Sequence, residues 1–116
     1  MNDENENIYV FQKMNGAGNT FLFHDSRNRK LSINKNLILS LQSFMSDYKF
    51  DQFICIDNPI RKGECLIKFW NADGTESGMC GNALRCVGDI ILRETKKDKI
   101  VIETIDKDIK CWRSNT

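Results

Sequence analysis

The most constraining feature of this sequence is an apolar segment from about Asn82 to Glu94. Its spacing predicts a helix with five residues on one side: Ala83, Val87, Ile90, Ile91 and Glu94. Because little of this segment is polar before Arg93, we expect the helix to be deeply buried. A helix of this kind needs other elements to cover it, and a curved sheet wrapped around it satisfies the pattern.

The rest of the chain predicts short strands and one further helix. Alternation and turn residues indicate strands at 8–14, 20–24, 52–56, 65–70, 99–104 and 108–112, with turns at 15–19, 73–74 and 106–107. Asn34 is predicted to cap the other helix. The expected fold class is therefore α+β, a mostly antiparallel curved, barrel-like sheet around a central helix, and residues 1–116 are expected to form a single domain.

Composition narrows the function classes. The net charge is +1 with no basic stripe, which argues against nucleic-acid or membrane-surface binding. No apolar run is long enough to span a membrane, and the polar, acidic start lacks the features of a secretory signal, so a cytoplasmic protein is expected. The odd count of 5 cysteines indicates free thiols, and their spacing, with His24 as the only histidine, predicts no metal site.

The residues with the clearest chemical potential lie just before the predicted apolar helix. A polar loop beginning at Asn71 leads to Cys80 at the expected helix N-terminus, where unpaired N–H groups and partial positive charge favour a thiolate. The amides of Gly81 and Asn82 could hold a carboxylate. From local sequence alone, Cys80 is equally well interpreted as a small packing residue, and packing is the expected role of Cys86 and of the three strand cysteines, Cys55, Cys65 and Cys111.

Two other positions could present amides to a ligand. Asn19 follows a glycine turn, although it could equally be a turn residue in the left-handed conformation. Gln52 stands at the entrance of a predicted strand. The glycines near Asn19 are not followed by the Lys-Ser/Thr pair and helix of a phosphate loop, so they do not predict a nucleotide site.

Three motifs together resemble the N-terminal half of diaminopimelate epimerase: K-M-N-G-A-G-N-T-F at 13–21, F-D-Q at 50–52 and F-W-N-A-D-G-T-E-S-G-M-C-G-N-A-L-R-C at 69–86. The resemblance implies an isomerase of two similar domains, each a barrel-like sheet around a helix and each supplying one cysteine. It further implies that two thiols interconvert LL- and meso-diaminopimelate without cofactor or metal, in bacterial synthesis of lysine and peptidoglycan precursors. By position, Cys80 matches one acid/base.

The same resemblance assigns the surrounding residues. Asn19, Gln52 and Asn71 match side chains that bind the amino-acid substrate, and Gly81 and Asn82 match backbone donors. The sequence departs from the family at Asn15, where histidine is usual, at Thr20, where aspartate is usual, and at 83–84, where Gly-Thr or Gly-Ala is usual.

Length is the largest departure, because family members are more than twice as long and no second C-G-x-G-like motif is present. The second catalytic cysteine is missing, and Cys86 cannot replace it, since six residues of helix place it about 9 Å along the axis on the same side of any substrate. We therefore expect the chain alone to be inactive, with the missing C-terminal domain as its partner. A fragment and a stand-alone domain both remain open, as does a homodimer.

Three alternative functions are weighed beside the epimerase. They are a related cofactor-independent amino-acid racemase, a non-enzymatic binding domain and a cysteine redox protein. The redox function is weakened by the absence of resolving-cysteine spacing.

Overall fold

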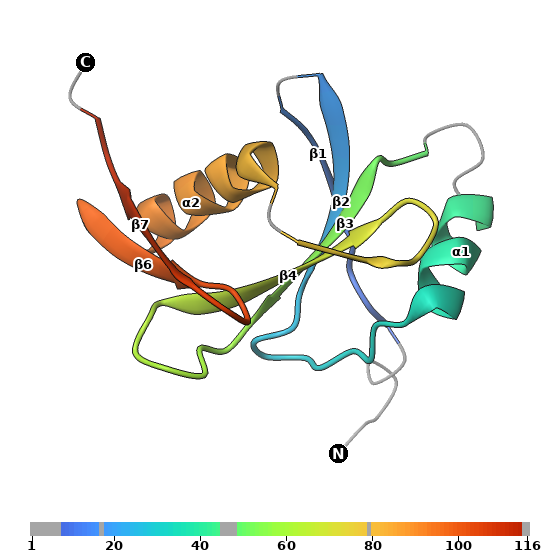
Figure 1. Ribbon diagram of the computed structural model, residues 1–116, viewed down its shortest axis with the longest axis horizontal. Helices are drawn as coiled ribbons and strands as arrows, with labels where there is room; N and C mark the ends of the chain where they lie inside the picture. The colour runs from blue at the N-terminus through green and yellow to red at the C-terminus, as the bar shows by residue number, and fades with distance from the viewer. Residues whose placement is uncertain (1–7, 17, 45–48, 79, 115–116) are drawn as a thin grey trace.

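A mixed sheet carries a helix on each of its faces (Figure 1). The computed structural model describes residues 8–16, 18–44, 49–78 and 80–114. Its strands are β1 (Gln12–Gly16), β2 (Asn19–Asp25), β3 (Gln52–Asp57), β4 (Cys65–Asn71), β5 (Glu76–Ser77), β6 (Lys99–Glu103) and β7 (Asp108–Trp112). The helices are α1 (Lys35–Phe44) and α2 (Gly81–Thr95).

The sheet has the order β1-β2-β3-β4-β6-β7, and β5 pairs with β4 outside this path. β1–β2, β3–β4, β4–β5 and β6–β7 are antiparallel, whereas β2–β3 and β4–β6 are parallel. The two parallel pairs are those whose connecting chain contains a helix, α1 in one case and α2 in the other, as parallel neighbours require a crossover. The α+β class with a mostly antiparallel curved sheet is confirmed.

Each helix covers a separate apolar core. On the α2 side, buried residues of the sheet such as Phe21, Ile54 and Phe69 pack with Val87 and Ile91 of the helix. A large side chain buried in this way contributes about 1.5–3 kcal/mol through loss of water contact. α2 is therefore held against this face of the sheet by a shared apolar core.

The second core lies on the opposite face of the same strands. There Leu22, Phe53 and Trp70 pack around Ile38 of α1. Asn34 Oδ1 accepts a hydrogen bond from the Leu37 amide at 2.9 Å, which confirms the predicted cap of this helix.

The first hairpin differs from its predicted boundaries. β1 begins at Gln12 rather than at residue 8 and continues to Gly16, which pairs directly with Asn19. Because pairing extends this far, only two positions remain for the turn. One of them is Gly18, whose φ of 88° favours glycine, and the other, Ala17, lies outside the described residues.

The prediction that α2 is deeply buried holds for one side of the helix only. Arg85, Asp89 and Arg93 recur every four residues and form one exposed face, on which Arg93 pairs with Asp89 at 2.9 Å. Glu94, expected on the apolar side, is exposed and pairs with Arg27 at 3.0 Å. The sequence interpretation gave too little weight to this polar stripe, and α2 is an amphipathic helix.

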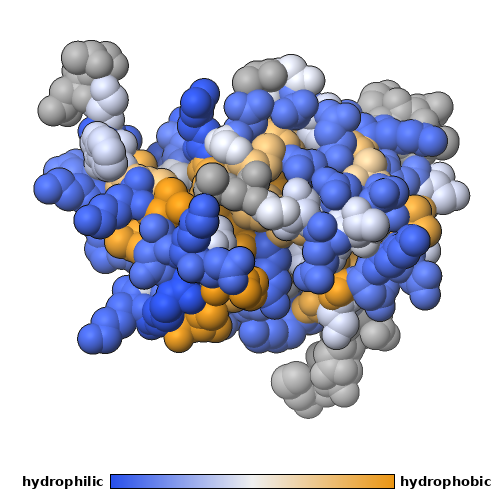
Figure 2. Space-filling model, in the orientation of Figure 1, coloured by the Kyte–Doolittle hydropathy of each residue, from blue (hydrophilic) through white to orange (hydrophobic). Residues whose placement is uncertain are grey.

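Hydrophilic residues separate the apolar patches on the visible surface (Figure 2). Two of the large exposed apolar side chains, Ile105 and Trp112, lie in or near the β6–β7 hairpin. Within the described ranges, no helix combines the length and apolar character needed to cross a membrane.

Candidate active site

The register of three strands brings the predicted substrate-binding side chains to one end of the sheet. Gln52 of β3 pairs with Asn71 of β4, and Phe21 of β2 pairs with the same Gln52. Asn19 precedes Phe21 by two residues and so points to the same face. The three amides therefore share the face of the sheet on which α2 packs, at the end where β2 and β3 begin and β4 finishes.

Each amide continues a row of buried apolar residues. Asn19 extends the row of Phe21, Gln52 extends that of Ile54, and Asn71 follows Phe69. All three amide residues are only partly buried. On the α2 side of the sheet, a step of two residues along β2, β3 or β4 therefore leads from the packed core to a polar, accessible edge.

Cys80 caps the N-terminus of α2. Its backbone is extended, with φ −119° and ψ 114°, and its carbonyl oxygen accepts the first helical hydrogen bond from the Leu84 amide at 2.9 Å. The thiol makes no capping hydrogen bond and is half-buried. Gly81 is exposed, and a Cβ built on it would have no atom within 4 Å among its surroundings. The thiol and the first-turn amides can therefore be approached from outside.

The helix N-terminus lies at the same end of the sheet as the amides. Figure 1 shows the first turn of α2 beside the β1–β2 hairpin that carries Asn19. Cys80 packs against the core that includes Phe21 and Phe69, which are two positions from Asn19 and Asn71 on their strands. The structure thus places Cys80, Gly81 and half-buried Asn82 at the start of α2, and Asn19, Gln52 and Asn71 at one end of the sheet.

The three amides differ in how the fold holds them. The Asn71 side chain donates to Thr75 Oγ1 at 3.0 Å, and its backbone N–H donates to the Thr75 carbonyl oxygen at 2.8 Å. Among the described residues, the side chains of Asn19 and Gln52 have no hydrogen-bond partner. Asn71 is therefore oriented by its own turn, while Asn19 and Gln52 keep their donors and acceptors for a ligand or for water.

Asp51 is a structural residue of the site that the sequence interpretation did not single out. Its carboxylate accepts a hydrogen bond from the Thr20 backbone N–H at 2.7 Å, and its own N–H donates to the Thr20 carbonyl at 2.8 Å. These bonds fasten the beginning of β2 to the beginning of β3. The position of Asp51 within the Phe50–Gln52 motif was the available signal.

Two of the residues that depart from the family pattern, Asn15 and Thr20, are partners of each other. Asn15 and Thr20 stand opposite one another in the hairpin, and Thr20 Oγ1 donates to Asn15 Oδ1 at 3.0 Å. A cross-strand side-chain pair of this kind stabilises a hairpin modestly. The hairpin that carries Asn19 is therefore closed without the usual histidine and aspartate.

The other cysteines serve packing. Cys55 and Cys65 are buried in strands, as predicted, and burial raises the pKa of Cys65 to about 12. Burial also raises the pKa values of Cys55, Cys86 and Cys111, with a smaller effect of Asp89 on Cys86. Thiols held protonated in this way are poor proton acceptors at neutral pH.

Neither the only histidine nor any metal cluster competes for a functional role in the described part of the chain. His24 is 3% exposed, and its ring nitrogens Nδ1 and Nε2 lie 3.0 Å and 3.1 Å from the carbonyl oxygens of Val10 and Arg29. Among residues 8–16, 18–44, 49–78 and 80–114, no three His, Cys, Asp or Glu side chains cluster closely enough to hold a metal ion.

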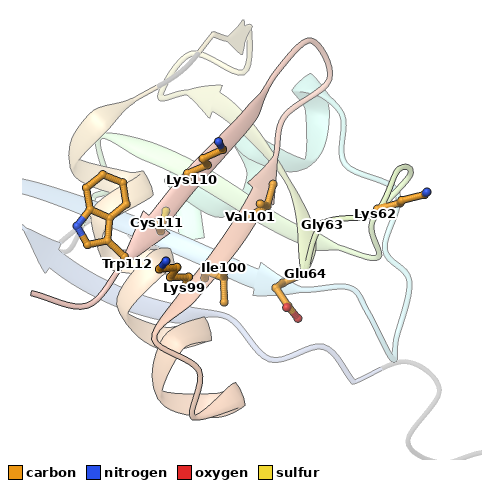
Figure 3. Close-up of a pocket in the computed structure, with 9 residues that line it drawn as sticks. All are labelled: Lys62, Gly63, Glu64, Lys99, Ile100, Val101, Lys110, Cys111 and Trp112. Carbon is orange, nitrogen blue, oxygen red and sulfur yellow. The ribbon is translucent and has the colours of Figure 1, made fainter.

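A separate groove of about 640 Å³ lies over β6, β7 and the loop before β4. Figure 3 shows Trp112 and Lys110 on one strand and Lys99 and Val101 on its neighbour. None of the candidate site residues lines this groove. The candidate site is therefore separate from this groove and lies at the end of the sheet that carries Asn19, Gln52 and Asn71.

Comparison with known proteins supports a single family. The family model for diaminopimelate epimerase matches residues 11–111. A diaminopimelate epimerase of Phenylobacterium zucineum is 37% identical over 94 residues, covering 81% of this chain and 34% of that protein. One from Wolbachia of Brugia malayi is 39% identical over 103 residues, covering 88% and 38%. The chain thus spans a little over a third of the length of these relatives.

Solved structures agree on the fold at low sequence identity. A putative phenazine biosynthesis PhzC/PhzF protein from Clostridium difficile superposes with a TM-score of 0.60 at 15% identity, over 92% of this chain and 40% of that one. A PhzF-family protein from Bacillus anthracis gives 0.58 at 17% identity, over 93% and 36%. These structures share the architecture, and the sequence matches give the family. The chain belongs to the diaminopimelate epimerase family.

Proposed function

We propose that this chain is the N-terminal catalytic half of a cofactor-independent diaminopimelate epimerase, with Cys80 as one of its two acid/base groups. The enzyme would interconvert LL- and meso-diaminopimelate in the bacterial cytoplasm, for lysine and peptidoglycan precursor synthesis. One observation carries the proposal. Half-buried Cys80 is the N-cap residue of α2, at the end of the sheet where Asn19, Gln52 and Asn71 leave the core.

The substrate is held at its reacting centre by neutral donors. Its α-carboxylate accepts hydrogen bonds from the backbone amides of Gly81 and Asn82, where the partial positive charge of the helix terminus favours an anion. The side-chain amides of Asn19, Gln52 and Asn71 bind the remaining polar groups. Because amides donate and accept without net charge, they suit a zwitterionic amino acid.

Proton transfer begins at the Cys80 sulfur. The thiolate takes the α-proton and becomes a thiol, and the electron pair of the C–H bond moves onto the α-carbon and the carboxylate oxygens. Fixed donors aimed at those oxygens stabilise the developing charge, and one such donor is typically worth about 3–4 kcal/mol in the transition state. The helix N-terminus supplies these donors without a cofactor.

Inversion requires a second group on the opposite face. Another thiol must deliver a proton there and become a thiolate, which completes the epimerisation with the thiol and thiolate roles exchanged. Cys86 is unsuited because it lies in the second turn of the same helix and burial raises its pKa. We propose that the second acid/base belongs to polypeptide outside residues 1–116, as the length of the relatives suggests.

The test separates binding from turnover. Purified protein should bind diaminopimelate, and the bound ligand should protect Cys80 from alkylation. The same protein should not epimerise diaminopimelate, and in D₂O it should produce no inverted product that carries deuterium. Cys80→Ala should abolish protectable alkylation, whereas Cys111→Ala, which removes another half-buried thiol, should leave it intact. A panel of other amino acids distinguishes a related racemase, for which a different substrate would protect best.

Two outcomes would overturn the proposal. Robust epimerisation by this chain alone would refute the requirement for a second thiol from elsewhere. Absence of both binding and protection would remove the substrate assignment and favour a binding domain of another kind.

A further inference from the structure

The hairpin that carries Asn19 and the helix that begins at Cys80 meet at a contact with no spare room. A Cβ built on Gly16 would lie 2.8 Å from Cys86 Sγ and 3.5 Å from Phe21 Cε2. The first distance is shorter than real Cβ contacts, and the second is an ordinary one. Only glycine fits at this point while the Cys86 sulfur keeps its position.

Backbone conformation does not explain the glycine. Gly16 is in strand β1, and the glycines with positive φ among the described residues are Gly18 and Gly74. An alanine at Gly16 would therefore meet no conformational strain and would be opposed by the sulfur of Cys86. Close packing against α2 is the property that this position requires.

Both sides of the contact are connected directly to the candidate site. Gly16 is the strand partner of Asn19, so a displacement of one moves the other. Cys86 lies five residues after Gly81, about 7.5 Å along the axis from the first turn of the helix. Cys86 also packs against the same core as Cys80.

We propose that Gly16 and Cys86 are positioning residues, whose contact sets the distance between the Asn19 hairpin and the helix N-terminus that bears Cys80. The inference rests on the proposed function for its consequence, because the distance matters only if one ligand is held from both sides. A rigid contact is needed there, since side chains that bind a small molecule must be held in place by the packing around them.

The test is a cycle of four proteins: the wild type, Gly16→Ala, Cys86→Ala and the double variant. Calorimetric titration with diaminopimelate, at a temperature where every variant is fully folded, should show affinity about tenfold lower for Gly16→Ala, as expected when one hydrogen bond to a charged ligand is lost. Cys86→Ala, which removes the sulfur from the contact, should also lower the affinity, but by less than Gly16→Ala does. The double variant should recover to within about threefold, because the atom that opposes the new methyl group has gone.

A matched control is available in the same helix. A Cβ at Gly88 would lie 3.5 Å from Cys111 Sγ, an ordinary contact between a glycine and another cysteine. Gly88→Ala should leave the affinity unchanged. If Gly16→Ala fails to fold, Cys86→Val adds bulk to the same contact from the helix side and should weaken binding in the same direction.

A ligand-independent readout separates this inference from the proposed function. The NMR resonances of the Asn19 side-chain amide and the Gly81 backbone amide should both shift in Gly16→Ala and return toward wild type in the double variant. If the wild type binds no diaminopimelate, the proposed function fails and these resonances alone decide the positioning role. Unchanged resonances in Gly16→Ala, or a double variant no closer to wild type than the single, would overturn it.

Discussion

At the start of β4 the fold surrounds a carboxylate with donors, whereas at the other end of the strand it leaves amides without partners. Glu103, beside Leu66 in the sheet, is 0% exposed. Its carboxylate accepts backbone hydrogen bonds from Gly63 at 2.6 Å, Ile60 at 2.8 Å and Arg61 at 3.0 Å. This polar group is fully used by the protein itself.

The opposite end of β4 has the reverse character. Gln52, paired with Asn71, is partly buried and its side chain has no hydrogen-bond partner among the described residues, and the same holds for Asn19. Partly buried polar groups without partners contribute little to folding. The comparison teaches that a polar group is structural when all its hydrogen-bond partners lie within the protein. A polar group without such partners is available to a ligand.

The largest effect on stability is expected at Glu103, whose carboxylate accepts several backbone hydrogen bonds beside the start of β4. Glu103→Gln keeps the shape but replaces the charge and turns one oxygen into an NH₂ group facing backbone donors. We expect the melting temperature to fall by several degrees, with diaminopimelate affinity unchanged in the folded protein. Glu76→Gln, at an exposed glutamate, is the control and should melt like wild type. Equal effects of the two variants would contradict the structural role of Glu103.

Acid should remove the same stabilisation. Burial raises the pKa of Glu103, but the hydrogen bonds from Gly63, Arg61 and Ile60 outweigh it and bring the pKa below its ordinary value of 4.5. A carboxylate whose folded-state pKa is lowered contributes stability above its unfolded-state pKa, and the contribution disappears as the pH falls through the folded-state pKa. Denaturant unfolding should therefore separate wild type from Glu103→Gln clearly at about pH 7 and less at about pH 3. A constant difference would contradict this assignment.

Gln52, beside the opposite end of β4, should affect ligand binding rather than stability. Gln52→Ala removes no hydrogen bond within the described protein, so the free energy of unfolding should change by less than about 0.5 kcal/mol. Affinity for diaminopimelate should fall about tenfold if the amide binds the charged ligand. Gln12→Ala, at an exposed glutamine of β1, is the matched control for both measurements. A loss of stability without a loss of affinity would reverse the comparison.

The sequence predicted the elements better than their exposure. Helical spacing, the Asn34 cap and the turn residues located both helices and six of the seven strands, because these signals are local. The pattern missed β5, which has two residues, and the polar face of α2. It could not give the parallel pairs β2–β3 and β4–β6, because strand pairing depends on contacts distant in sequence.

The candidate site was predicted residue by residue, but not its connections. The motifs singled out Cys80 and the amides, and the strand register then explains why Gln52 and Asn71 are neighbours. The bonds from Asp51 to Thr20 and the Gly16–Cys86 contact join segments separated by tens of residues, and no spacing rule reveals them. Motifs identify the groups proposed to contact a ligand, whereas tertiary structure identifies the residues that hold those groups in place.

The last prediction concerns the β1–β2 hairpin, where the exposed side-chain pair should have a small effect on stability. The hydrogen bond from Thr20 Oγ1 to Asn15 Oδ1 is exposed, so Thr20→Val and Asn15→Ala should each lower the free energy of unfolding by about 0.5 kcal/mol. The double variant should lose no more than either single variant, because both remove the same bond. Chemical denaturation of the four proteins gives this coupling. The bond from the Thr20 backbone N–H to Asp51 survives every substitution, which isolates the side-chain pair. Additive losses would show that the two side chains act independently, and the hairpin would then be held by its backbone and by Asp51.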